Sequence, residues 1–353
     1  MDQHTDSLSD SSSSRAGPRS GRLAQWFGYL LAVAGLIWVF HDIRLAELPA
    51  QMTSIHWGWV GVALVCDVLT YLCQGWRWQL LLEPVGELSA WRTTQAVYAG
   101  LFTNEVLPMR FGELVRAYLA SRWLAADFMA VIPSMVVERL LDGVWLAVGI
   151  GLTVMFVPLP RNLLEAGDAL GAAMLVATAL FVYVVVRKEK QLEAGTAANA
   201  PGRQSWLKLF VARLAKGLRE IGLARAFGLA GGLSLAMMVL QALAFWLILW
   251  AYGLKVSFWI GAAVYLIVHL GTALPNAPAN VGTYQFFTVV ALTLFGVDKT
   301  TAAGFSVVVF ILLTLPLWIL GSIALSRSGR TLYSLRAEIN QRLARGSARP
   351  DGF

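Results

Sequence analysis

Charged residues are scarce in this sequence: Asp, Glu, Lys and Arg make up 14% of its 353 residues, while 57% are hydrophobic. The mean hydropathy is +0.62. So little charge excludes an ordinary soluble domain and indicates an integral membrane protein. In a soluble protein the net charge of +7 would suggest a nucleic-acid partner. Here the basic residues gather in a few loops, so we interpret them as membrane topology and expect no nucleic acid.

Cysteine and histidine are also sparse, with two and four copies. Cys66 and Cys73 lie in one apolar segment. A helical rise of about 1.5 Å per residue separates their backbones by roughly 10 Å, which is too far for a disulfide. The histidines show no metal-ligand spacing, and His269, in an apolar segment, is interpreted as a hydrogen-bonded core residue. We therefore expect no metal and no other cofactor.

Common catalytic motifs are missing as well. The sequence has no nucleophile elbow, no Walker loop, no HExxH and no DxD-like acidic pair in a predicted exterior loop. We therefore predict no catalytic residues and no enzymatic activity.

Long apolar segments, by contrast, are abundant. Six are long enough to cross a bilayer, at about 23–40, 57–82, 128–157, 168–186, 226–252 and 301–325. Two further pairs of segments are shorter, 91–106 with 111–124 and 258–275 with 283–296. Each pair is interrupted by a cluster that contains Pro and Gly, at 107–112 and at 275–282, and the second cluster also contains Asn. The sequence thus predicts an all-α integral membrane protein, a polytopic helical bundle.

Basic residues predict the orientation of this bundle. The loop 187–225 carries nine of them and the segment 327–353 carries six, whereas the other connections carry few. The positive-inside rule then places both termini and this loop in the cytoplasm, with the protein in the cell inner membrane. We divide the chain into a disordered, Ser-rich segment at 1–22, a membrane domain at 23–326 and a basic tail at 327–353.

The distribution of basic residues agrees with the positive-inside rule only if each interrupted pair enters and leaves the membrane on the same side. The first pair would enter from the cytoplasm and the second from outside. We therefore predict two opposed re-entrant hairpins. A short repeat agrees, because 108–112 (PMRFG) matches 278–282 (PANVG) as P-x-[RN]-x-G, 170 positions later. Together these features predict an inverted repeat. Transporters built in this way bind substrate near broken helices at the repeat interface.

The long loop contains one more predicted helix, at about 205–221. Its apolar residues fall on one helical face: Trp206, Phe210, Leu214, Leu218 and Ile221. Two interpretations are open. The helix either lies on anionic lipid at the membrane surface or packs against the cytoplasmic side of the protein itself.

Polar residues of the stretch 103–116 and of the group 138–142 form the candidate binding site. They are Asn104, Arg110, Glu113, Arg116, Glu138, Arg139 and Asp142. A charge at membrane depth costs roughly 2.5–3.5 kcal/mol, so these side chains should face a protein interior or an aqueous cavity. Either the arginines only pair with the carboxylates and fix the hairpin to its neighbour, or they also bind a headgroup phosphate through their planar forks.

The second hairpin offers neutral polar groups. Asn276 and Asn280 either satisfy backbone groups freed by the helix break or contribute to binding. We include both, together with Tyr284, among the candidate substrate-binding residues. Gln241, in the preceding apolar segment, is interpreted as an interhelical hydrogen-bonding group.

These motifs resemble a known family. The residues Asn104, Pro108, Arg110, Gly112, Glu113 and Arg116, then Glu138, Arg139 and Asp142, then Pro278, Gly282 and Tyr284 are similar to those of the lysylphosphatidylglycerol synthase transmembrane family. This is the flippase-like membrane domain of bacterial multiple peptide resistance factors, and the resemblance covers about 23–326. The factors add a soluble aminoacyl-transferase domain, which we do not expect here because only 327–353 follow the last span. Many relatives carry Glu where this sequence has Gln285.

The resemblance implies lipid translocation, the movement of a phospholipid, a polyprenyl-phosphate-linked sugar or a hopanoid-type lipid between leaflets. Its implied partners are membrane lipids with anionic or phosphate-bearing headgroups, and proteins of lipid or glycan synthesis. Two alternatives are open. One is an integral-membrane enzyme of lipid-linked glycan synthesis that uses Glu105 or Asp142 as a base. The other is a non-transporting accessory subunit of a lipid- or envelope-synthesis complex.

Overall fold

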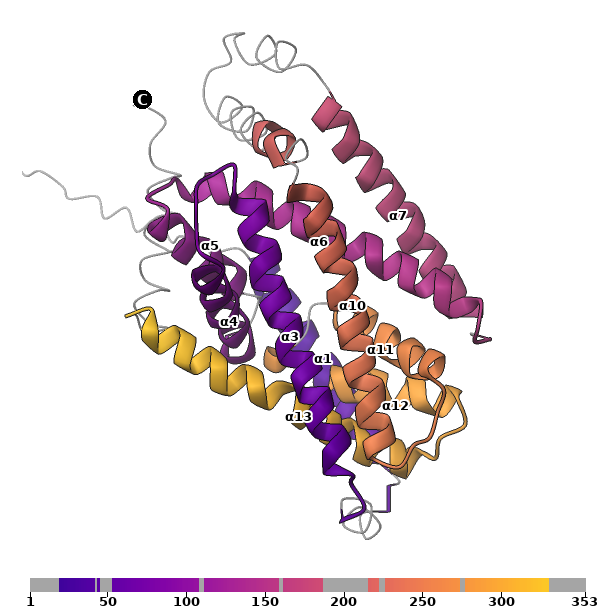
Figure 1. Cartoon of the computed structure of the whole chain (residues 1–353). Helices are drawn as coiled ribbons and strands as arrows, with labels where there is room; N and C mark the ends of the chain where they lie inside the picture. Colours follow the sequence, from indigo (N-terminus) through magenta and orange to yellow (C-terminus); the bar gives the residue numbers. More distant parts are fainter. Residues whose placement is uncertain are drawn as a thin grey trace, which may run out of the picture.

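The computed structural model describes residues 19–41, 43–44, 53–107, 111–158, 161–186, 215–221, 226–273 and 277–329 (Figure 1). Within these ranges the chain is helical, with short connections and no strand. The main elements are α1 (Arg19–Phe40), α3 (Trp57–Leu82), α4 (Ala90–Val106), α5 (Gly112–Trp123), α6 (Phe128–Val154), α7 (Arg161–Val186), α10 (Ala226–Ala251), α11 (Phe258–Thr272), η2 (Pro278–Asn280), α12 (Thr283–Leu294) and α13 (Lys299–Arg327). The all-α prediction is confirmed.

These helices follow the predicted apolar segments, and side chains at their starts explain several boundaries. Ser89, Asp127, Ser257 and Asp298 precede α4, α6, α11 and α13, and each accepts a hydrogen bond from a first-turn backbone N–H. The largest difference is α7, which begins at Arg161 and not at the predicted 168. Polar residues in its first two turns lower the local hydropathy without disfavouring a helix.

Three of the described helices are long and apolar enough to cross a membrane by length and composition, namely α3, α10 and α13. Shorter apolar helical stretches occur at Gly28–Phe40, Gly167–Tyr183 and Phe258–Thr272. Of the amphipathic helix predicted at 205–221, only 215–221 lies within the described residues, and this part is helical. The rest of that prediction lies outside them.

The bundle is centred on α3 and α10, which run side by side through the middle of the molecule (Figure 1). α4 packs against α3, α5 and α13, and α5 also contacts α6. α11 packs against α10 and α12, and α12 also contacts α1 and α13. Two hydrophobic cores result, one around Trp78 and Leu119 and the other around Phe245 and Phe305.

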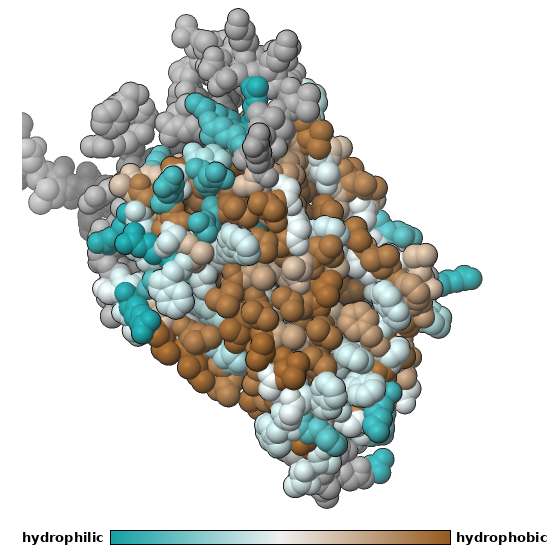
Figure 2. Space-filling model, in the orientation of Figure 1, coloured by the Kyte–Doolittle hydropathy of each residue, from teal (hydrophilic) through white to brown (hydrophobic). Residues whose placement is uncertain are grey.

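The central helix α3 is polar inside and apolar outside. Its outward residues are large and exposed: Val62, Val65, Leu69, Leu72 and Trp76. Its buried residues include four polar ones, Asp67, Thr70, Gln74 and Arg77, beside apolar ones. This is the reverse of a helix on the surface of a soluble protein, and it suits contact with hydrocarbon. Figure 2 shows the corresponding hydrophobic residues across the middle of the visible face, with hydrophilic residues towards its ends.

The first interrupted pair forms a helical hairpin because its helices touch at two glycines. A Cβ on Gly112 of α5 would overlap the carbonyl oxygen of Gly100 in α4, so neither position has room for a side chain. The backbone N–H of Gly112 donates to Asn104 Oδ1 at 2.7 Å. Asn104 therefore satisfies one of the free donors at the start of α5.

The second interrupted pair turns through η2 and Gly282. Gly282 has φ +85°, a left-handed conformation that favours glycine. A side chain there would also overlap the backbone of Ala32 in α1. The Gly282 N–H donates to Gln285 Oε1 at 2.7 Å. The side chain of Gln285 thus caps the start of α12 through its Oε1 oxygen, an atom that a Glu at this position would also supply.

Candidate functional site

A buried ionic network joins α3, α5 and α6, with Glu138 at its centre. Glu138 Oε2 accepts a hydrogen bond from Arg116 Nη2 at 2.6 Å, and Oε1 accepts one from Arg116 Nη1 at 3.0 Å. Oε1 also accepts from Arg77 Nη2 at 2.8 Å and from Gln74 Nε2 at 3.1 Å. The side chains of Arg77 and Glu138 are 0% exposed and that of Arg116 is 5% exposed. Ions so deeply buried persist only when they are paired.

Four further residues extend the network, and three of them, Glu113, Arg139 and Asp142, lead towards the surface. Arg77 donates to Asp142 Oδ1 and, at 2.8 Å, to the hydroxyl of Ser234 in α10. Arg139 Nη2 donates to Glu113 Oε1 at 2.7 Å, and Arg139 Nη1 lies 3.5 Å from Asp142 Oδ2. Among the described residues the network therefore holds three guanidinium groups and three carboxylates, whose formal charges cancel.

The network keeps some binding capacity. Arg116 stacks over Trp78, with its guanidinium carbon 4.6 Å from the ring centroid, and Trp78 Nε1 donates to Ser134 Oγ at 3.1 Å. The Nε atoms of Arg77 and Arg116 are buried without a hydrogen-bond partner in the described part of the chain. Arg139 is 49% exposed, which makes it the most accessible cation of the network. An anion arriving from the surface would meet Arg139 first.

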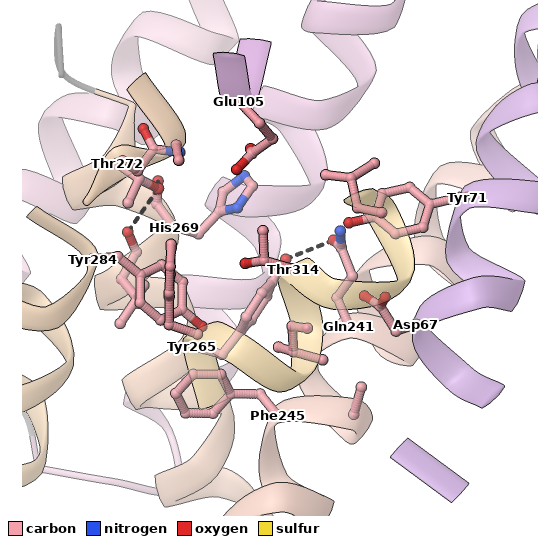
Figure 3. A pocket seen from close by; sticks show the side chains of 17 residues that line it. Asp67, Tyr71, Glu105, Gln241, Phe245, Tyr265, His269, Thr272, Tyr284 and Thr314 are labelled. Atoms are coloured by element: carbon pink, nitrogen blue, oxygen red, sulfur yellow. Dashed lines mark hydrogen bonds between the residues drawn. The ribbon is translucent and has the colours of Figure 1, made fainter. Parts of the chain in front are cut away.

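A cavity of about 170 Å³ lies further along α3, between both hairpins (Figure 3). Helices from both halves of the chain line it, with Glu105 at the end of α4 on one side and Asn280 of η2 on another. Its polar or titratable lining residues are Asp67, Tyr71, Glu105, Gln241, Tyr265, His269, Thr272, Asn280, Tyr284 and Thr314. The Tyr265 hydroxyl donates to Gln241 Oε1 at 2.7 Å, so the predicted interhelical role of Gln241 is confirmed.

The structure divides the predicted site residues into separate groups. It joins Glu113, Arg116, Glu138, Arg139 and Asp142 in the network. Asn104 lies at the turn beside them, where its side chain caps α5. Asn280 and Tyr284 line the cavity, not the network. Arg110 and Asn276 lie outside the described residues.

Sequence reasoning missed several residues of these sites, including three of the network and Asp67 of the cavity. Arg77, Gln74 and Ser234 belong to the network, and Asp67 lines the cavity. A usable signal was present, since Asp67, Gln74 and Arg77 interrupt an apolar run at helical spacing and would be costly against lipid. The prediction for His269 was wrong, because this side chain is exposed and lines the cavity. It lies in the last turn of α11, with its ring 5.6 Å from that of Tyr265 between centroids.

The fold and the buried charges define a polytopic helical membrane protein with an ionic network inside its hydrophobic core. The chain belongs to the family described as the lysylphosphatidylglycerol synthase TM region, whose model matches residues 25–321. The resemblance seen in the motifs is thereby confirmed.

Two relatives show how far the similarity reaches. A UPF0104 membrane protein from Methanothermobacter thermautotrophicus is 24% identical over 296 residues, which cover 79% of this chain and 85% of the relative. Glycosyltransferase AglD from Haloferax volcanii is 24% identical over 314 residues, which cover 79% of this chain. The match covers only 50% of the length of AglD.

Proposed function

We propose that this protein moves a lipid, or a lipid-linked headgroup, with a phosphate group between the two leaflets of the cell inner membrane. The observation that carries the proposal is the neutral, buried network of arginines and carboxylates within membrane helices, which reaches the surface at Arg139. Intramembrane ionisable residues mark substrate and ion pathways in membrane proteins. Family membership supports a membrane role, and the similarity to AglD favours a lipid connected with glycan synthesis.

In this proposal, a phosphate replaces a carboxylate as the partner of an arginine. Glu113 is 26% exposed and Arg139 is 49% exposed, so a headgroup oxygen reaches this pair without unfolding the core. Arg116, which lies 3.9 Å from Glu113, is the next guanidinium inwards. Glu138 stays bound between Arg77 and Arg116 and keeps both in place. The planar fork of arginine suits bidentate phosphate binding.

An inverted repeat with opposed re-entrant hairpins forms part of the proposal, together with cytoplasmic termini. The packing of the helices supports it, because each contact within α3–α6 has a counterpart within α10–α13. α4 packs on α5 as α11 packs on α12, and α3 packs on α4 as α10 packs on α11. The end of the first hairpin also approaches the second, since α4 contacts η2. Binding near such a junction is the general pattern of repeat-built transporters.

The test is a lipid-flipping assay on the full chain in vesicles of phosphatidylcholine and phosphatidylglycerol with fluorescent phosphatidylglycerol. Arg139→Ala should slow flipping at least several-fold relative to wild type. Arg122→Ala is the matched control, because this arginine is exposed on α5 and is not among the residues paired in the network. Equal rates for Arg139→Ala and wild type would refute the site. A wild-type rate no higher than that of protein-free vesicles, also with a polyprenyl phosphate probe, would refute transport.

A second candidate function is an enzymatic or accessory role in lipid-linked glycan synthesis, favoured by the similarity to a protein named a glycosyltransferase. Glu105 is its candidate base, since it lines the cavity and its Oε2 accepts a bond from Trp318 Nε1 at 3.4 Å. Purified protein incubated with polyprenyl phosphate and a labelled nucleotide sugar would then form labelled lipid, and Glu105→Gln would abolish this product. Stoichiometric co-purification of a synthesis enzyme, without flipping by the isolated chain, would support the accessory role.

A further inference from the structure

Asp67 is a buried carboxylate that the ionic network does not use. It lies near the middle of α3, the central helix that is long enough to cross a membrane. Asp67 is 5% exposed, and its Oδ2 is buried without a hydrogen-bond partner among the described residues. Figure 3 shows its carboxylate pointing into the cavity beside Gln241. An ionised carboxylate in such a place loses its hydration without full compensation.

The surroundings of Asp67 offer acidic and neutral groups. The titratable side chains that share the cavity are Tyr71 of α3, Glu105 of α4, Tyr265 and His269 of α11 and Tyr284 of α12. Tyr98 of α4 packs against Tyr71, with ring centroids 5.3 Å apart, and Cys66 is the preceding residue of α3. No lysine or arginine is among the described residues that line the cavity. A negative charge on Asp67 therefore meets no permanent cation among these residues, which distinguishes the cavity from the network; His269 is cationic only when it is protonated.

The size of the cavity favours water over a headgroup. A buried water needs roughly 10–15 Å³ of such volume, so the cavity of about 170 Å³ has room for several waters. Pockets for organic ligands typically measure about 300–1,000 Å³. Within the described residues no group of three or more His, Cys, Asp and Glu side chains could hold a metal ion. The proton is the ligand that fits a hydrated cavity with an unpartnered carboxylate.

We propose that this cavity is a proton-binding site and that Asp67 is the group that takes up and releases the proton. The proton passes between cavity water and a carboxylate oxygen of Asp67, with Glu105 and His269 as the other proton-exchanging groups on the cavity wall. Gln74 lies seven residues from Asp67 on the same face of α3 and donates to Glu138. The proton site and the ionic network therefore lie on one face of the same helix.

The proton site is independent of the proposed function, and its test reads protonation directly. Purified full-length protein in phosphatidylcholine–phosphatidylglycerol nanodiscs is examined by infrared difference spectroscopy between alkaline and acidic buffer. Wild type should gain a carboxylic-acid carbonyl band of a buried group on acidification, and Asp67→Asn should lose it. Asp168→Asn is the matched control, because Asp168 is exposed on α7 and far from the cavity lining. This control should keep the band.

Isotope labelling makes the test independent of how well any variant folds. In wild-type protein with ¹³C-labelled aspartate, the band should move to lower frequency, whereas ¹³C-labelled glutamate should leave it in place. The proposal is overturned if aspartate labelling leaves the frequency of the band unchanged, or if the Asp67→Asn variant still shows the band. A band that responds to sodium at constant pH, and not to pH, would overturn it in favour of a metal cation. Flipping by wild type without any such band would leave the proposed function standing and refute only the proton site.

Discussion

Removing Glu138 should destabilise the protein far more than removing Glu113, although both belong to one network. The Glu138 carboxylate accepts bonds from three side chains, Arg77, Arg116 and Gln74, and is 0% exposed. In Glu138→Ala, Arg77 keeps Asp142 and Ser234, whereas Arg116 keeps only Glu113 at 3.9 Å. Breaking a buried ion pair by deleting one partner costs about 3–5 kcal/mol. Because one deletion breaks two pairs, we expect a loss at the upper end of this range.

Glu113→Ala provides the contrast. Glu113 and its main partner Arg139 are 26% and 49% exposed, so water replaces much of their interaction. Pairs of this kind contribute roughly 0–1 kcal/mol. The two variants delete the same charge from the same network, and they differ in the burial of the carboxylate. Their stability difference should therefore be about 3 kcal/mol or more.

Reversible unfolding of the purified protein in mixed micelles measures this difference, with the denaturant midpoint and slope followed by the fluorescence of its tryptophans. Glu138→Gln keeps a carbonyl oxygen for the arginines, so its loss should fall between those of the two alanine variants. If Glu138→Ala and Glu113→Ala were equally stable, the network would not hold α3, α5 and α6 together. The assignment of its buried half would then be refuted.

Two more perturbations test the close helix contact and the cavity. Gly112→Ala should lower the free energy of unfolding by about 1–3 kcal/mol, since the added methyl group overlaps the Gly100 carbonyl. Gly228 is exposed on α10 with open space around it, so Gly228→Ala should raise the free energy of unfolding by about 0.5–1 kcal/mol. Equal effects of the two substitutions in thermal unfolding would contradict the helix contact. Asp67→Asn should raise the unfolding temperature, because the neutral amide is cheaper to bury than an unpartnered carboxylate. The gain should grow as the pH rises, since only the ionised form carries this cost, and a gain independent of pH would count against it.

Local pattern predicted most of the helices and five of the six charged residues of the ionic network. Apolar length placed α3 at 57–82, its observed range, and the Pro and Gly of 107–112 predicted the break between α4 and α5. The spacing within 138–142 put Glu138 and Asp142 on one helical face. These features depend on the helical repeat and on hydropathy, which act between residues near one another in the chain. These features can therefore be predicted from the sequence without knowing which helices pack together.

Only the tertiary structure decided which charges meet. Arg77 binds Glu138 across 61 positions and Ser234 across 157, because α3 crosses both α6 and α10. Arg77 is a single charged residue in a long apolar segment, and the neighbouring residues in the sequence do not indicate which side chains it binds. The same holds for Asp67, whose cavity is built from α3, α4, α10, α11, η2, α12 and α13. The sequence by itself determined that polar groups lie within apolar helical segments. The packing of the helices against one another determined that some of these groups are paired, whereas Asp67 Oδ2 has no hydrogen-bond partner among the described residues.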